Sequence, residues 1–101
     1  MKLIIITAVK EFESDVKKLF KKAQIPIFSF KDINGYRDIS EESIESNWFG
    51  GDYNEVKSIM FYSFAEETKA DVLYTEIDEF NQHLKSKSKI HIAILNIEKT
   101  N

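Results

Sequence analysis

The chain has 101 residues, of which 43% are hydrophobic and 31% are charged, a composition typical of one soluble domain with one core. The absence of cysteine excludes disulfides, thiolate metal sites and thiol nucleophiles. The net charge of -3 argues against nucleic-acid binding. Because no apolar run reaches the roughly 18 residues of a membrane span, we expect a cytoplasmic protein that is not embedded in a membrane.

The beginning of the chain predicts a strand, a helix and a second strand. Residues 3–9 are apolar except for Thr7, which is typical of a central strand that is covered on both faces. A second strand is expected at 25–33, and Pro26 near its start favours an edge position. Between the strands, a helix expected at 14–23 places one apolar stripe at helical spacing: Val16, Leu19, Phe20 and Ala23.

The stretch that follows differs in composition, and we expect a long loop at about residues 37–54. Together with the residues just before it, this loop holds all three glycines and the only tryptophan. Asn34 and Gly35 predict a tight turn or a position with positive φ where the second strand ends. Trp48 and Phe49 lie next to two glycines in an acidic context. They anchor a partner protein, or they fold back onto the core edge or a subunit seam.

The rest of the chain repeats the order strand, helix, strand. Residues 56–64 predict the third strand, a helix begins near Ala65, and residues 90–97 predict the fourth strand. A polar, lysine-bearing segment at 83–89 connects the last two. The second helix carries a regular apolar stripe of Ala70, Leu73, Ile77, Phe80 and Leu84.

This order, β-α-β-β-α-β, predicts the α+β, ferredoxin-like fold, a four-stranded antiparallel sheet with both helices on one face. The whole chain, 1–101, forms one domain. Two helices cover only one face of the sheet, yet the first strand is apolar on both faces. We therefore expect the second face to be buried by oligomerisation.

The sequence contains no phosphate-binding loop, dinucleotide fingerprint or nucleophile elbow. Of its two histidines, His91 alternates away from the isoleucines of the fourth strand and is expected on the open face of the sheet. Two roles are open for His91 on this face. It forms a metal or pH-sensitive site at a subunit interface, or it is a partly exposed imidazole that is hydrogen-bonded locally.

The opening of the chain resembles PII-type signal transduction proteins. Their Ile-rich first strand runs into a Lys-Pro-Phe segment, and their second strand closes in Gly-Phe-Gly-Arg. The equivalents here are Val9-Lys10-Glu11-Phe12 and Ile33-Asn34-Gly35-Tyr36-Arg37. The resemblance implies a non-catalytic homotrimer that senses nucleotides or other small effectors in clefts between subunits. It also implies a loop, here 37–54, that docks on a partner such as a membrane transporter or efflux protein.

The same resemblance implies the residues of the site. Ligand binding falls to two groups, Gly35, Tyr36 and Arg37 at the end of the second strand and Lys85, Lys87 and Lys89 after the second helix. Trp48 and Phe49 contact the partner. The family binds nucleotide phosphates with a glycine-rich loop, but residues 82–89 contain no glycine. The lysines then act as point charges, and the effector is a nucleotide or a divalent metal.

Two other functions fit the same fold. A metal-responsive trimer of the CutA type is supported by His91 and the many carboxylates. A small enzyme of the dimeric α+β barrel type needs an open cavity and few catalytic groups. The oligomeric state and metal binding distinguish these two functions from the sensor.

Overall fold

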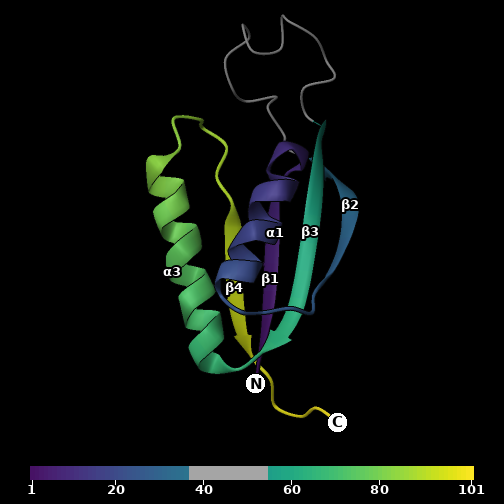
Figure 1. Ribbon diagram of the computed structural model, residues 1–101. Helices are drawn as coiled ribbons and strands as arrows, with labels where there is room; N and C mark the ends of the chain where they lie inside the picture. The colour runs from purple at the N-terminus through teal and green to yellow at the C-terminus, as the bar shows by residue number, and fades with distance from the viewer. Residues whose placement is uncertain (37–54) are drawn as a thin grey trace, which may run out of the picture.

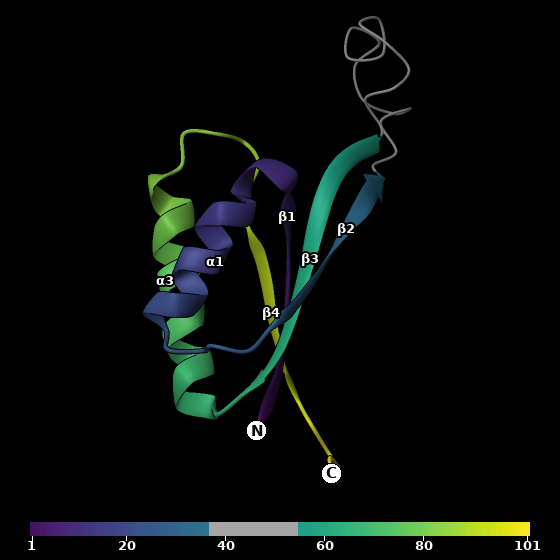
Figure 2. The same ribbon diagram turned by 45° about the vertical axis from the view of Figure 1, so that its right-hand side comes forward.

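The computed structural model describes residues 1–36 and 55–101, which form one antiparallel sheet with two helices packed on one of its faces (Figures 1 and 2). The strand order is β2–β3–β1–β4, as the ferredoxin-like prediction requires. The predictions for the 37–54 loop, Arg37, Trp48 and Phe49 lie outside the described residues. The elements are β1 Lys2–Val9, a 3-10 turn η1 Lys10–Phe12, α1 Glu13–Lys22, β2 Ser29–Tyr36, β3 Glu55–Ala65, α3 Glu67–His83 and β4 His91–Asn96.

The central strand is β1, which pairs with β3 on one side and β4 on the other. Its alternate residues Ile4, Ile6 and Ala8 are buried beneath the helices. The residues between them are only half-buried, because they face the side of the sheet that has no helix. The predicted central position of β1 is confirmed.

Helix α1 packs on the sheet through Val16 and Phe20, both fully buried. The ring of Phe20 stacks on Phe28 with 4.3 Å between ring centroids. The helix ends in a Schellman motif. Gln24 lies in the left-handed region at φ 60°, its N–H donates to the Lys21 carbonyl, and the next N–H, of Ile25, donates to the Phe20 carbonyl.

This C-terminal motif explains why the second strand begins later than predicted, at Ser29 instead of residue 25. The chain needs residues 24–28 to reverse direction, and Pro26 has no N–H for a strand partner. The Ile27 carbonyl instead accepts a hydrogen bond from the Ser63 hydroxyl at 2.7 Å. The predicted edge position of this strand is confirmed.

The tight turn predicted at Asn34 and Gly35 is wrong, because β2 continues through both residues to Tyr36. Gly35 is extended strand, and a Cβ there would lie 3.0 Å from the Ser58 hydroxyl oxygen on β3. The glycine therefore serves the close approach of two strands and not a change of direction.

The hairpin of β2 and β3 extends past the rest of the sheet. The β1–β3 register stops at Val9 opposite Ser58, whereas β2 and β3 stay paired as far as Tyr36 opposite Glu55. Residues 34–36 and 55–57 thus form a two-stranded ribbon, from which the chain enters and leaves residues 37–54 (Figure 2).

Helix α3 buries Ala70, Leu73 and Ile77, which confirms the core of its predicted stripe. It begins at Glu67, two residues later than expected, because Ala65 still pairs with Lys2 in the sheet. Leu84 lies just beyond its end. No helix in the described ranges is long and apolar enough to cross a membrane.

Candidate functional site

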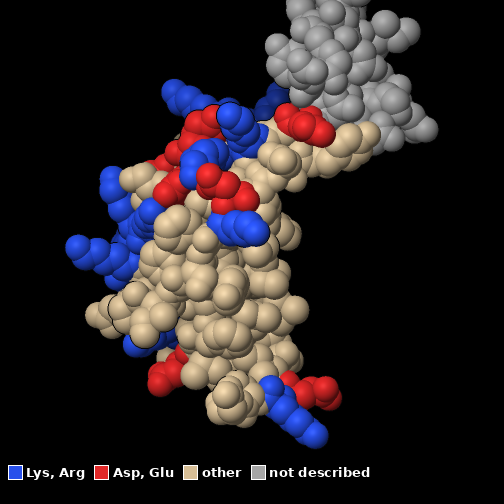
Figure 3. Space-filling model, turned by 90° about the vertical axis from the view of Figure 1, so that its right-hand side faces the viewer, with Lys and Arg blue, Asp and Glu red and all other residues tan. Residues whose placement is uncertain are grey.

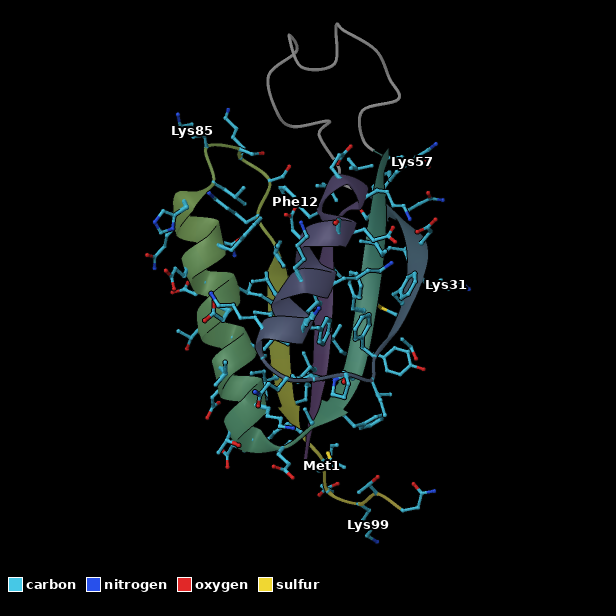
Figure 4. The ribbon with its side chains drawn as sticks, in the orientation of Figure 1. Met1, Phe12, Lys31, Lys57, Lys85 and Lys99 are labelled. Carbon is cyan, nitrogen blue, oxygen red and sulfur yellow. The ribbon has the colours of Figure 1, made fainter. Side chains whose placement is uncertain are left out.

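The predicted ligand-binding residues lie at the end of the molecule from which residues 37–54 emerge. A depression of about 400 Å³ opens there between η1 and the ribbon. Lys57 and Lys85 both lie at this end, Lys57 on β3 and Lys85 beyond α3 (Figure 4). The depression is lined by Lys10, Asp32, Ile33, Asn34, Lys57 and Ser58.

Lys10 organises one wall of this depression. Its ammonium lies 2.5 Å from an oxygen of Asp32 on β2 and 2.5 Å from an oxygen of Glu13 at the start of α1. The hydrogen bond to Asp32, followed by the one to Glu13, raises the pKa of Lys10. The pKa of Glu13 is lowered, first by Lys10 and then by Lys17. The wall is therefore a charge-balanced network that ties η1 to β2.

Lys57 gives the depression its surplus charge. Among the described residues it forms no ion pair, whereas Lys10 is matched by two carboxylates. The amide of Asn34 stands in the same lining. The Ser58 hydroxyl already donates to the Val56 carbonyl at 3.2 Å. The set suits a small anion that takes a charged hydrogen bond from Lys57 and a neutral one from Asn34.

Of the predicted β2 residues, Gly35 and Tyr36 lie on the ribbon beside this depression. Gly35 supplies a close backbone approach, and Tyr36 is 69% exposed. Neither residue lines the depression itself. The sequence prediction thus named residues beside this depression but not Lys10 and Lys57, which line it. The sequence offered one signal for each of them. Lys10 directly follows the predicted first strand, and Lys57 lies just after the predicted loop.

The predicted lysines after α3 lie at the same end of the molecule but beside β4, which is the opposite edge of the sheet (Figure 1). Two strands separate β4 from β2, so the two groups stand about 14 Å apart at the usual strand spacing. One chain therefore does not bring all of the predicted ligand-binding residues into one pocket.

Within this second group the lysines differ in what they contact. The Lys89 ammonium donates to the carbonyls of Asn81 and Leu84, at 2.9 and 3.1 Å, and so completes the end of α3. Lys85 and Lys87 are exposed. These two remain available to an anion, whereas Lys89 is engaged by the protein backbone.

Asn81, which the sequence analysis did not single out, fixes the segment that carries these lysines. The side-chain NH₂ of Asn81 donates to the Ile90 carbonyl at 2.8 Å, and the side-chain oxygen Oδ1 accepts the Ile90 N–H at 2.9 Å. This pair of bonds joins α3 to the residue just before β4. The signal for it was an amide side chain near the end of an amphipathic helix.

His91 begins β4 and lies opposite Thr7 of β1, on the face without helices, as predicted. It is exposed. Within residues 1–36 and 55–101, no group of three or more His, Asp or Glu side chains is placed to hold a metal ion.

The face without helices is a broad apolar surface. Strand register places Leu3, Ile5, Tyr62, Phe64 and Leu95 together on it. Tyr62, Phe64 and Leu95 are 42%, 55% and 42% exposed, and the rings of Tyr62 and Phe64 meet edge to face at 6.4 Å. Seen from the β2 edge, charged side chains gather toward residues 37–54 and along the helices, and the lower half is largely uncharged (Figure 3).

Comparison with known proteins gives relatives by structure only. No family model matches the sequence, and no curated protein matches it. One similar solved structure is a protein of Thermus thermophilus described as a PII-like signaling protein. The two are 16% identical, the TM-score is 0.64, and the match covers 95% of this chain and 85% of that one.

A second similar structure is CPII, a nitrogen regulatory PII-like protein from Thiomonas intermedia, which is bound to ADP, AMP and bicarbonate. It is 10% identical, with a TM-score of 0.63, and the match covers 99% of this chain and 94% of CPII. Both matches cover at least 95% of this chain. The chain therefore has the fold of PII-like signaling proteins, as the resemblance of its opening residues predicted.

Proposed function

We propose that the protein is a non-catalytic PII-like regulator that assembles as a homotrimer, binds a small anionic effector in clefts between subunits, and docks on a partner through residues 37–54. The observation that carries this proposal is the uncovered apolar sheet face in a chain with the PII-like fold. An exposed apolar surface of this breadth is typical of an interface between proteins.

The placement of the charged residues also supports the proposed oligomer. The described strand residues on the apolar face include a single lysine, Lys31, so little charge has to lose its hydration when copies meet there. The depression beside Lys10 and Lys57 lies at the end of this same sheet. A neighbouring copy packed on the open face adds a second wall near that end, which is how a shallow depression becomes a cleft.

The effector is best matched by a small anion such as a nucleotide or bicarbonate. Lys57, Lys85 and Lys87 are exposed cations at one end of the molecule. They are not held in a glycine-rich loop, and the phosphates are therefore bound by side-chain ammonium groups instead of by backbone N–H groups. We expect weaker nucleotide binding than such a loop allows, with a steep dependence on salt.

Native mass spectrometry of the untagged protein tests the assembly and the effector together. The protein is measured alone and with ATP, ADP, bicarbonate, Zn²⁺ or Cu²⁺. We expect a trimer that takes up three effector molecules. A dimer contradicts the proposal and favours the barrel enzymes. Uptake of metal alone, lost in His91→Ala, favours the metal-responsive alternative.

Two matched variants test the interface. Leu95→Glu places a charge on the apolar sheet face, and Val72→Glu places one on the outer side of α3, at residues that are 42% and 45% exposed. We expect Leu95→Glu to yield monomers at concentrations where Val72→Glu stays trimeric. If both variants remain trimers, the open face is not the interface.

Docking through residues 37–54 is tested by deleting residues 43–52. The deletion is expected to keep the trimer and the effector stoichiometry, and to remove the partner proteins that the wild-type chain retains in affinity capture from its own cells. Partners that are captured equally by both chains contradict the docking proposal.

A further inference from the structure

A second depression lies on the helix side of the sheet, where the end of α1 turns toward β2. Its volume is about 390 Å³, which falls within the usual size range of small-molecule sites. It shares no lining residue with the depression beside Lys10 and Lys57. The lining consists of Lys17, Lys21, Gln24, Ile25, Pro26 and Phe28.

The apolar part of this lining is held rigidly. Ile25 is buried, and its N–H is fixed by the Phe20 carbonyl. The Phe28 ring lies almost parallel to the Phe20 ring, at an interplanar angle of 12°, and its centroid is 5.9 Å from that of Phe61. Pro26 adds a second flat and rigid surface. The depression is therefore preformed, and a ligand entering it loses little free energy to ordering of the protein.

Within the described residues, the polar part of the lining carries one positive charge that no carboxylate matches. Lys17 and Lys21 are one helical turn apart and so project from the same side of α1. Lys17 is already bound to a Glu13 oxygen at 2.7 Å, and its ammonium lies 4.2 Å from the centre of the Phe30 ring. Lys21 forms no ion pair with any side chain in the described ranges.

From these observations we infer that this depression binds a small aromatic monocarboxylate. The flat ring lies against the surfaces of Pro26 and Phe28. The carboxylate meets Lys21, the one cation of this lining whose charge is not already balanced within the described ranges, and the Gln24 side chain brings an amide donor to the same lining. A dianion lacks a second cation in this lining that is unpaired among residues 1–36 and 55–101, and a neutral ring leaves Lys21 unmatched there.

The inference is independent of the proposed function, because it uses neither the open sheet face nor residues 37–54. The proposed ligand lies in the depression beside the segment that joins α1 to β2. The site is thus separate from the effector depression at the other end of β2, and the two can be occupied together.

Amide chemical-shift titration of the full chain tests the inference with 2-naphthoate and with the neutral 2-naphthylmethanol. In the wild type we expect shifts centred on residues 21–28 and tighter binding of the carboxylate by about fivefold, the upper range of an exposed ion pair. Lys21→Gln should remove this preference. Lys18→Gln, which changes a lysine of the same helix outside the depression, should retain it.

Lys21→Glu gives a second reading that a folding defect does not imitate. It should reverse the preference, so that 2-naphthylmethylammonium binds more tightly than 2-naphthoate. Three results overturn the inference. These are equal binding of the carboxylate and the alcohol by the wild type, equal losses in Lys21→Gln and Lys18→Gln, or shifts centred on the open sheet face.

Discussion

The two hydrogen bonds between the Asn81 side chain and the backbone of Ile90 allow the loss of stability in Asn81→Ala to be predicted. Asn81→Ala removes both side-chain partners of Ile90, a residue that is 2% exposed. Each lost bond is worth about 1 kcal/mol net. Alanine recovers about 0.5 kcal/mol through its higher helix propensity. We therefore expect the free energy of unfolding to fall by about 1.5 kcal/mol, or by more where the Ile90 groups stay dry.

Urea denaturation followed by circular dichroism, at one protein concentration for all variants, measures this loss. Gln82→Ala is the matched control, because Gln82 is the next helical residue and, within the part of the chain that the structure describes, donates only to Asp78, at 3.1 Å on the exposed surface. Its loss should stay below about 0.5 kcal/mol. Asn81→Asp keeps the acceptor for the Ile90 N–H and should lie between the two. An alanine variant no less stable than Gln82→Ala refutes the reasoning.

Three further predictions rest on single contacts. Phe20→Ala empties a fully buried ring site and should lower the free energy of unfolding by about 3–5 kcal/mol in urea. Glu13 has a pKa below its ordinary value of 4.5, chiefly because of Lys10. Its stabilisation is therefore complete above that value and lost as the pH falls through the lower pKa of the folded state. Thermal unfolding of Glu13→Gln should lose less stability between about pH 5 and pH 3 than the wild type, and equal losses contradict this assignment. Gly35→Ala should lower the free energy of unfolding by about 0.5–1 kcal/mol more in the wild type, where Ser58 is present, than in a Ser58→Ala background. A double-mutant cycle that shows no coupling between the two positions contradicts the crowding seen there.

Much of the fold could be predicted because hydrophobic periodicity reports burial directly. The apolar run of β1 matched a central strand, and most residues of the two predicted helix stripes are buried, whereas Leu19, Phe80 and Leu84 are only half-buried. The edge position of β2 followed from Pro26. These features depend on which side chains avoid water, and that preference is written into residue type and spacing.

The errors arose where backbone geometry, and not burial, decides the structure. Gln24 adopts a left-handed conformation that glycine usually takes, so the residue type gave no sign that α1 ends in a Schellman motif and delays β2. Gly35 was interpreted as a turn residue, but it is extended and accommodates Ser58 of the neighbouring strand. Strand contacts of this kind depend on register, which a single sequence does not reveal.

The candidate site was only partly predictable for the same reason. Lys85, Lys87 and Lys89 look equivalent in sequence, yet Lys89 alone reaches the carbonyls at the end of α3. Lys10 and Lys57 are 47 positions apart in the chain and are neighbours only because η1 follows β1 and β3 runs antiparallel to it. Charge counts identify cations, whereas the fold determines which of them are still free.

The ribbon of β2 and β3 beyond the sheet has a consequence for how the molecule opens. A two-stranded segment is marginally stable by itself, because it lacks the third strand and the helix layer that hold the rest of β3. Amide hydrogen exchange should therefore quicken along β3 from Ile59 toward Glu55, while Phe61 and Ser63 exchange only through global unfolding. The chain would thus approach residues 37–54 along a gradient of local stability. Events at the tip would be coupled to the core through the few pairs around Ser58, where the support of β1 ends.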